Sequence, residues 1–434
     1  MVKRISSSLQ KVRHNTFSSL KVRNYRLYFI GQSISLSGTW MQTIGQAWLV
    51  LKLTNSGTAL GLVTALQFLP VLIFGAMGGV IADRTSKRKL LYFTQSSAAV
   101  LALILAILVA SHTIQLWMLY ILATLLGLVN AVDNPARRTF VLEMVGSQQL
   151  GNAITLFSTT FNLSRIIGPA IAGAVIAAAG LAPCFFINAV SFIAVLVCLF
   201  MMRSEELYPV EPVKRAKGQL REGLKYVGSS PLLRNFLIMM AIVGTLTYEF
   251  QVNLPLIAKY TFHSNANGFA LLNSAMGLGA VLGGLASASR KKMTTASLVF
   301  TTFAFGVSVI LAAISPSLRI ALLAMIIVGV FSIRFGATGE TMLQLESAPN
   351  MRSRVMSLWS VAFLGSTPIG GPIVGWIGEY ASPRWSLTVS GLAAIAAGFY
   401  GFLTLSDKYQ NKSSSKKNEA TPVTIEKEKA KEMI

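Results

Sequence analysis

Long apolar stretches follow one another through nearly the whole chain, and short polar or basic segments separate them. An α-helix needs about 20 apolar residues to cross the hydrocarbon core of a membrane. Roughly twelve such stretches fit within the 434 residues, which are 53% hydrophobic and only 12% charged. Because backbone polar groups find no water in lipid, each stretch must be helical. The sequence therefore predicts an all-α polytopic membrane protein with about twelve transmembrane helices.

The distribution of positive charge predicts how the chain lies across the membrane. The formal net charge is +22, yet Lys and Arg avoid the apolar stretches and gather in the termini and in every second short loop. When successive loops are assigned to alternate sides of the membrane, 32 of the 38 basic residues lie on one side and four on the other. Cytoplasmic loops carry such an excess, so both termini are expected in the cytoplasm. A nucleic-acid-binding protein would carry its cations on a folded polar surface, and we expect no nucleic acid partner.

Residues suited to metal, cofactor or catalytic chemistry are sparse. Cys184 and Cys198 are 14 residues apart in one predicted helix, about 21 Å by helical rise, which is too far for a disulfide. The three histidines show no metal-ligand spacing, and no nucleotide-binding P-loop is present. We expect no metal, no cofactor and no enzymatic activity. The alternative, a polytopic membrane enzyme, would need a catalytic constellation that the apolar stretches lack.

A glycine-rich apolar run ends in a short basic loop at residues 78–89, GGVIADRTSKRK. A loop that only sets orientation would explain the cations but not the acid or the glycines. The segment resembles the G-x-x-x-D-R-x-x-R-R/K loop between helices 2 and 3 of the major facilitator superfamily. The resemblance implies a cytoplasmic gate between two helix bundles, made by Gly79, Asp83, Arg84, Arg88 and Asp133.

Two glycine motifs recur at a nearly constant offset. Gly78-Gly79 corresponds to Gly283-Gly284, 205 residues later, and Gly168-Pro169 corresponds to Gly371-Pro372, 203 residues later. An internal repeat of six spans is the architecture of this transporter fold. We therefore expect five segments: a basic cytoplasmic N-terminal segment (1–26), a six-helix bundle (27–202), a cytoplasmic linker with an amphipathic helix (203–231), a second six-helix bundle (232–406) and a charged cytoplasmic tail without regular structure (407–434).

Polar residues recur at helical spacing in the first and fifth stretches. Steps of three or four place them on one helix face. Such a face lines a water-filled cavity, or it holds helices together through hydrogen bonds. For Arg165, a structural ion pair and an anion-binding role both stay open. We predict a substrate cavity lined by Gln32, Thr39, Gln42, Gln46, Asn152, Thr159, Asn162 and Arg165.

Glu249 is the one carboxylate predicted to lie deep within an apolar stretch. Thr245 and Asn253 lie one turn to either side, so the helix face that carries Glu249 is polar. An ionisable group in a membrane is costly unless it is paired or hydrated, and such groups mark ion and proton pathways. We predict Glu249 as the proton-coupling carboxylate. The alternative is a structural ion pair with a cation such as Arg165.

Three further segments resemble one branch of the superfamily, which contains enterobactin-type siderophore exporters and macrolide-efflux proteins. They are residues 37–42 (SGTWMQ), 133–138 (DNPARR) and 162–169 (NLSRIIGP). The resemblance implies a transporter that exports a small organic solute by alternating access and proton antiport. We expect it to act as a monomer in the lipid bilayer of the inner (plasma) membrane. An importer or a lysolipid flippase of the same fold is the alternative.

Overall fold

The computed structural model describes residues 17–208, 219–288, 294–348, 351–363 and 365–419, and the regular structure in these ranges is helical. The helices of the first half are η1 (Ser18–Lys21), α2 (Arg23–Thr54), α3 (Gly57–Arg84), α4 (Lys87–Ala110), α5 (Leu116–Ala179), α6 (Ala182–Met201) and η2 (Ser204–Glu206). The remaining helices are α7 (Gln219–Ser229), α8 (Pro231–Ile242), η3 (Val243–Thr247), α9 (Phe250–Leu256), η4 (Ile257–Thr261), α10 (Ala266–Ala288), α11 (Thr295–Ala313), α12 (Leu318–Glu346), α13 (Arg352–Phe363), α14 (Thr367–Tyr380) and α15 (Pro383–Glu419).

Ten helices or joined helices in the described residues are long and apolar enough to cross a membrane. The 64-residue α5 counts once among them, although a straight helix of that length would be about three times as long as a bilayer core is thick. Its backbone leaves helical geometry at Gly146, and its two arms match the fourth and fifth predicted spans. The polar helix α2, the first predicted span, is not among the ten. The predicted fold class, an all-α polytopic membrane protein, is confirmed.

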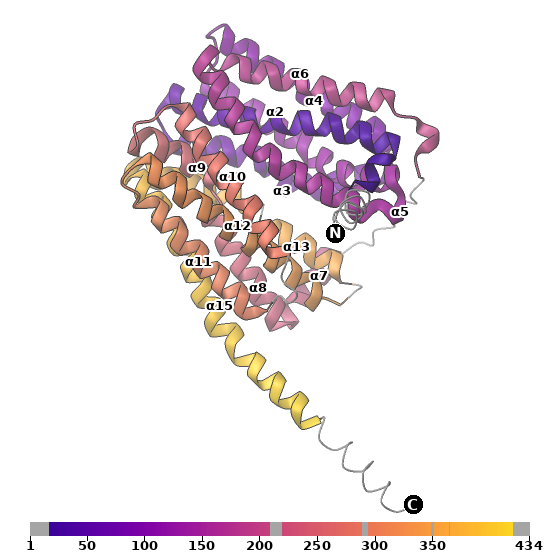
Figure 1. Cartoon of the computed structure of the whole chain (residues 1–434), viewed down its shortest axis with the longest axis vertical. Coiled ribbons are helices and arrows are strands. Elements are labelled where there is room, and N and C mark those ends of the chain that lie inside the picture. Colours follow the sequence, from indigo (N-terminus) through magenta and orange to yellow (C-terminus); the bar gives the residue numbers. More distant parts are fainter. Residues whose placement is uncertain (1–16, 209–218, 289–293, 349–350, 364, 420–434) are drawn as a thin grey trace, which may run out of the picture.

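Connections between helices alternate between two ends of the molecule. One end, here named the turn face, carries the tight turn at Asn55–Ser56 between α2 and α3 and the turn between α14 and α15. The other end, the loop face, carries the connection between α3 and α4 and the chain after α6. In Figure 1 the indigo-to-magenta helices α2 to α6 form one group, and the orange-to-yellow helices form a second group beside it.

Equivalent helix pairs pack in the same way in the two halves. A side chain at Gly78 would overlap the carbonyl oxygen of Ala131, so α3 and α5 touch through their backbones. A side chain at Gly283 would likewise overlap the carbonyl oxygen of Val330, which brings α10 against α12. Small residues permit this close approach of membrane helices. The shared packing supports the internal repeat that the glycine motifs predict.

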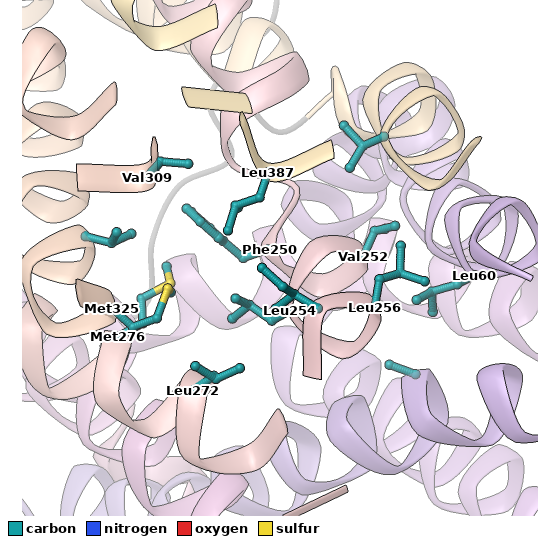
Figure 2. Close-up of a cluster of buried hydrophobic side chains, with 14 of the residues drawn as sticks. Leu60, Phe250, Val252, Leu254, Leu256, Leu272, Met276, Val309, Met325 and Leu387 are labelled. Carbon is teal, nitrogen blue, oxygen red and sulfur yellow. The ribbon is translucent and has the colours of Figure 1, made fainter. Parts of the chain in front are cut away.

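The two halves meet along the part of the helices nearest the turn face. Gly57 and Gly61 of α3 lie against the backbone of Gly375 and Gly371 of α14. α5 and α10 form the second line of contact between the halves. Figure 2 shows part of the buried apolar cluster in this region, with Leu60 of α3 and side chains of α9, α10 and α15.

The last helix is longer than the sequence predicts. The final span was expected to end near Leu405, before a tail without regular structure, but α15 continues to Glu419. Residues 402–419 contain neither glycine nor proline to end the helix. Residues 1–16, 209–218, 289–293 and 420–434, for which the sequence also gives expectations, are not among the residues that the structure describes.

The predicted amphipathic helix of the linker is α7, which packs against α8 and α13.

Candidate functional site

Two of the predicted spans are interrupted midway rather than continuous. The seventh span passes from α8 through the π-helical turn η3, leaves helical structure at Tyr248 and Glu249, and resumes as α9. The eleventh span is divided into α13 and α14, and α14 begins at Thr367 with Ser366 as its N-cap. Non-helical backbone is tolerated at membrane depth only where it is buried in protein or lines a cavity. The two interruptions are therefore candidates for a functional site, because each one leaves backbone groups at membrane depth that the surrounding protein or a cavity must satisfy.

Glu249 lies where these two interruptions meet. Its side chain is only 2% exposed, and Thr367 of α14 is its hydrogen-bonding neighbour. A side chain at Gly370 would come within 2.9 Å of Glu249 Oε1, and one at Gly371 within 3.6 Å of Oε2, so the carboxyl group rests against the first turn of α14. Glu249 Oε1 has no hydrogen-bond partner among the described residues. The start of a helix favours negative charge, which suits a carboxylate here.

Arg165 does not pair with Glu249. Its guanidinium group lies 5.6 Å from the ring of Trp40 on α2, and Nη2 is 3.7 Å from the sulfur of Met276 on α10. No acidic side chain in the described part of the chain forms an ion pair with it, and its buried Nε has no partner. The ion pair that the sequence left open is therefore absent between these two residues. A buried cation without an acid is suited to an anionic ligand.

An aromatic cluster lies on the other half near this arginine. Tyr248 contacts Phe250, Phe305, Phe335 and Phe363, with ring centroids 4.6 to 6.4 Å apart. Its hydroxyl donates a 2.6 Å hydrogen bond to the carbonyl oxygen of Ser332 on α12. This cluster provides flat apolar surface beside the interrupted seventh span.

The second arm of α5 presents an exposed polar face. Thr155, Ser158 and Thr159 are exposed, and Asn162 and Arg165 follow on the same face. The hydroxyls of Thr155 and Thr159 and the amide of Asn162 bond only to carbonyl oxygens one turn earlier. Exposed polar side chains at membrane depth face a water-filled space rather than lipid. Thr39 of α2 is exposed in the same way.

Three of the predicted cavity residues instead bind neighbouring segments. Gln32 accepts a 2.8 Å hydrogen bond from Arg137, and Gln42 accepts one of 2.6 Å from Asn188. Asn152 accepts hydrogen bonds from the backbone and the hydroxyl of Ser19. These contacts correspond to the second role that the sequence left open for a polar face, the joining of helices.

Gln46, by contrast, lines a small pocket between the halves. Thr43, Thr64 and Gln67 of the first half and Gln251 of α9 line the same pocket, together with the apolar residues Ala47, Leu60 and Val63. The sequence pattern does not single out Gln67, which is flanked by apolar residues, or Gln251, which lies two residues from both Glu249 and Asn253 and therefore on a different helix face.

Charged side chains of the second half hold the turn face closed. Glu379 of α14 accepts hydrogen bonds from Ser56 Oγ (2.6 Å) and from the backbone of Thr58 (2.8 Å), at the start of α3. Lys259 donates to the carbonyl oxygen of Leu51 (2.6 Å) and to Asn55 Oδ1 (2.7 Å), at the end of α2. We name these contacts the turn seal. Each charge has the sign that its helix terminus favours.

A family model described as transmembrane secretion effector, within the major facilitator superfamily, matches residues 14–434. The chain belongs to this family. It is a transporter of the major facilitator superfamily and not an enzyme.

Characterised relatives and solved structures agree with this assignment. The staphyloferrin A transporter of Staphylococcus aureus is 25% identical over 85% of this chain and 93% of its own length. The enterobactin exporter EntS of Salmonella typhimurium is 24% identical over 88% of this chain and 92% of its own. The solved nucleoside transporter NupG has the same fold, with a TM-score of 0.70 at 15% identity over 89% of this chain and 99% of that one.

The predicted gate residues of this transporter lie at the loop face of the first half. Arg88 donates to the carbonyl oxygens of Leu199 and Phe200 at the end of α6. Asp133 is buried and pairs with Arg137. Gly79, Asp83 and Arg84 form the end of α3, where Gly79 is buried and Arg84 is exposed. The described contacts of Arg88 and Asp133 thus join helices within one half.

Proposed function

We propose that this transporter exports a small organic solute in exchange for protons, by alternating access between the bundles 27–202 and 232–406. The observation that carries the proposal is Glu249, a buried carboxyl group without a paired cation, at the meeting point of two interrupted helices. The name of one relative, an enterobactin exporter, supports the outward direction. The family description, a secretion effector, supports it as well.

The charge distribution supports an orientation with the loop face and both termini in the cytoplasm of a cell with this protein in its inner (plasma) membrane. In that orientation the turn seal closes the external end of the path, and the polar face of α5 stays open towards the cytoplasm. We infer that Gly79, Asp83, Arg84, Arg88 and Asp133 shape the cytoplasmic gate when the two bundles close on that side.

Glu249 is proposed as the site that takes up and releases the proton. A carboxyl group at membrane depth is stable when it is neutral or when it is paired. Here the neighbours are a hydroxyl, two glycines and a helix start, so both protonation states have some support from the protein. A change in water access during the transport cycle would then be enough to load or unload the proton.

Arg165 is proposed to bind a negatively charged group of the solute. It has no acid partner among the described residues, and Trp40 and Phe161 form an aromatic pair beside it, with ring centroids 5.9 Å apart. A guanidinium group over an aromatic ring keeps its donors directed to an incoming anion. We therefore propose an anionic solute with apolar or aromatic parts.

The replacement Glu249→Gln tests the proposed function, because Gln resembles the protonated acid. Purified protein in liposomes is supplied with enterobactin or staphyloferrin A, and transport is followed with and without an imposed pH gradient. The wild type should accumulate at least one solute when the gradient is applied. Glu249→Gln should still exchange that solute across the membrane but should not accumulate it.

Glu340→Gln is the matched control, since Glu340 of α12 bonds to the neighbouring Gln344 rather than to an interrupted helix. This variant should accumulate solute as the wild type does. Gradient-driven accumulation by Glu249→Gln would remove this residue from the mechanism. Movement of lysolipid between leaflets, in place of either solute, would support the flippase alternative.

A further inference from the structure

Three glutamine side chains from opposite halves of the transporter converge on one pocket. Gln46 comes from α2 and Gln67 from α3, whereas Gln251 comes from α9 of the second half. Thr43 and Thr64 add hydroxyl groups, and no charged residue lines the pocket. The pocket lies on the side of the molecule that the turn seal closes, since Gln46 and Gln67 are 9 and 11 residues from Asn55 and Ser56 in α2 and α3.

These three amides differ from other glutamines in the membrane helices of the first half. Gln32, Gln42 and Gln95 all hydrogen-bond to polar side chains of neighbouring helices. Within the described part of the chain, the amides of Gln46, Gln67 and Gln251 have no protein partner, and they border the pocket instead. A primary amide offers two donors and one acceptor, and leaving them unpaired away from water is costly. The amides of Gln46, Gln67 and Gln251 are not among the buried polar groups that lack a partner, so they face the pocket, where water or a polar group of the solute can hydrogen-bond to them.

We propose that this pocket is a substrate subsite that takes an uncharged hydrogen-bonding group of the exported solute, an amide or a hydroxyl. The proposal rests on the transport function proposed above and specifies its substrate class. A charged group would enter the pocket without a counter-charge and would lose its hydration, which disfavours it. An amide or hydroxyl instead exchanges its hydrogen bonds to water for hydrogen bonds to the glutamines.

The subsite also gives a minimum length for a solute that reaches both it and Arg165. Trp40, which holds Arg165, precedes Gln46 by six residues on α2. Six residues rise by about 9 Å along a helix. Along the axis of α2 the two sites are therefore offset by roughly 9 Å, and a solute that binds both must be long enough to bridge this offset. Because both halves line the pocket, this end of the solute loses its contacts when the halves separate at the turn face.

The test replaces the amides and keeps the side-chain length. Gln46→Met and Gln251→Met are made singly and together, and Gln115→Met serves as the control, because Gln115 lies in the connection before α5 and bonds to Trp117. Transport of enterobactin and of staphyloferrin A into liposomes gives kcat and KM. Each single variant should raise KM about threefold and the double variant about tenfold, as expected for lost hydrogen bonds. The kcat and the accumulation driven by a pH gradient should stay unchanged.

The outcomes separate the two proposals. Unchanged KM in folded variants, with transport by the wild type intact, would overturn the subsite and leave the proposed function standing. A wild type that moves neither solute would contradict the proposed function, and the subsite would fall with it. The single variants keep the test decisive should the double variant not fold, because each has its own expected change in KM. An equal rise in KM for Gln115→Met would also count against the subsite.

Discussion

At the residue scale, Asp133 ties together three helices of the first half. It pairs with Arg137 one turn along α5, and it accepts hydrogen bonds from Thr94 and Gln95 of α4 at 2.6 and 2.8 Å. Arg137 in turn donates to Gln32 of α2. Such a network is stabilising only while every member keeps its partners, since a buried charge left alone is costly.

Two neighbouring arginines allow this network to be tested. Arg137→Gln should lower the free energy of unfolding by about 3 kcal/mol, because it leaves the buried Asp133 without its cation. Arg138→Gln should change it by less than about 0.5 kcal/mol, because Arg138 is exposed. Thermal unfolding of the purified variants in detergent compares them. Equal stability of the two variants would show that the ion pair contributes nothing.

The residue scale is also where sequence reasoning reaches its limit. Spacing places Gln32, Gln42 and Gln46 on one face of α2, but it does not say which of them meets a neighbouring side chain. Gln32 meets Arg137 and Gln42 meets Asn188, and both of these partners come from distant parts of the chain. Helical periodicity is local information, whereas the partner of a buried amide depends on tertiary packing.

At the scale of whole helices, the interruptions of the seventh and eleventh spans were not predicted. Both stretches are apolar and long enough to read as single helices. The nearest signals are Pro368, in the first turn of α14, and Pro255, which lies inside α9. Prolines are common in membrane helices, because neighbouring helices satisfy the backbone groups that proline leaves free, so their presence alone does not locate a break.

Gly370→Ala tests the contact between the two interrupted helices. A side chain there would overlap the carbonyl oxygen of Thr245 in η3 and approach Glu249. The expected result is a loss of stability of about 1–3 kcal/mol and loss of proton-driven transport. Gly284→Ala is the control, because no atom lies within 4 Å of the added group. Thermal unfolding and gradient-driven uptake measure the two effects, and wild-type behaviour of Gly370→Ala would argue against close packing at this point.

The turn seal predicts how the turn face opens. Lys259→Met removes the cation that holds the end of α2, together with its two hydrogen bonds to Leu51 and Asn55, and should favour the state that is open at the turn face by at least about tenfold. Lys52→Met is the control, since Lys52 is an exposed lysine at the same face. The readout is the labelling rate of a cysteine at Thr43 with a membrane-impermeant thiol reagent added outside, in a background without Cys184 and Cys198. Equal labelling in both variants would mean that the seal does not hold this face closed.

At the scale of the whole molecule, the fold class and the repeat could be predicted from the sequence. The lengths of the apolar stretches, the bias of the basic residues and the paired glycines can all be read without knowledge of the tertiary packing.

The orientation in the membrane is predicted from the same bias of basic residues, and it can be tested. In a background without native cysteines, Thr113→Cys at the turn face should react with an impermeant thiol reagent added to intact cells. Ser86→Cys at the loop face should react only after the cells are opened. Both positions are exposed, so the reverse pattern would invert the orientation.

The crossing of α3 and α14 bears on how much work the transport cycle requires. Gly57 and Gly61 lie against the backbone of Gly375 and Gly371 there, and the side chain of Leu256 lies beside Gly57. Separating apolar side chains from one another in water costs about 25 cal/mol for each Å² exposed. The glycines themselves expose little apolar surface when the crossing parts, so the cost of opening this region comes from the buried apolar side chains around it, such as Leu60 and Leu256. The glycine crossing thus brings α3 and α14 into close contact at the turn face without adding apolar surface of its own.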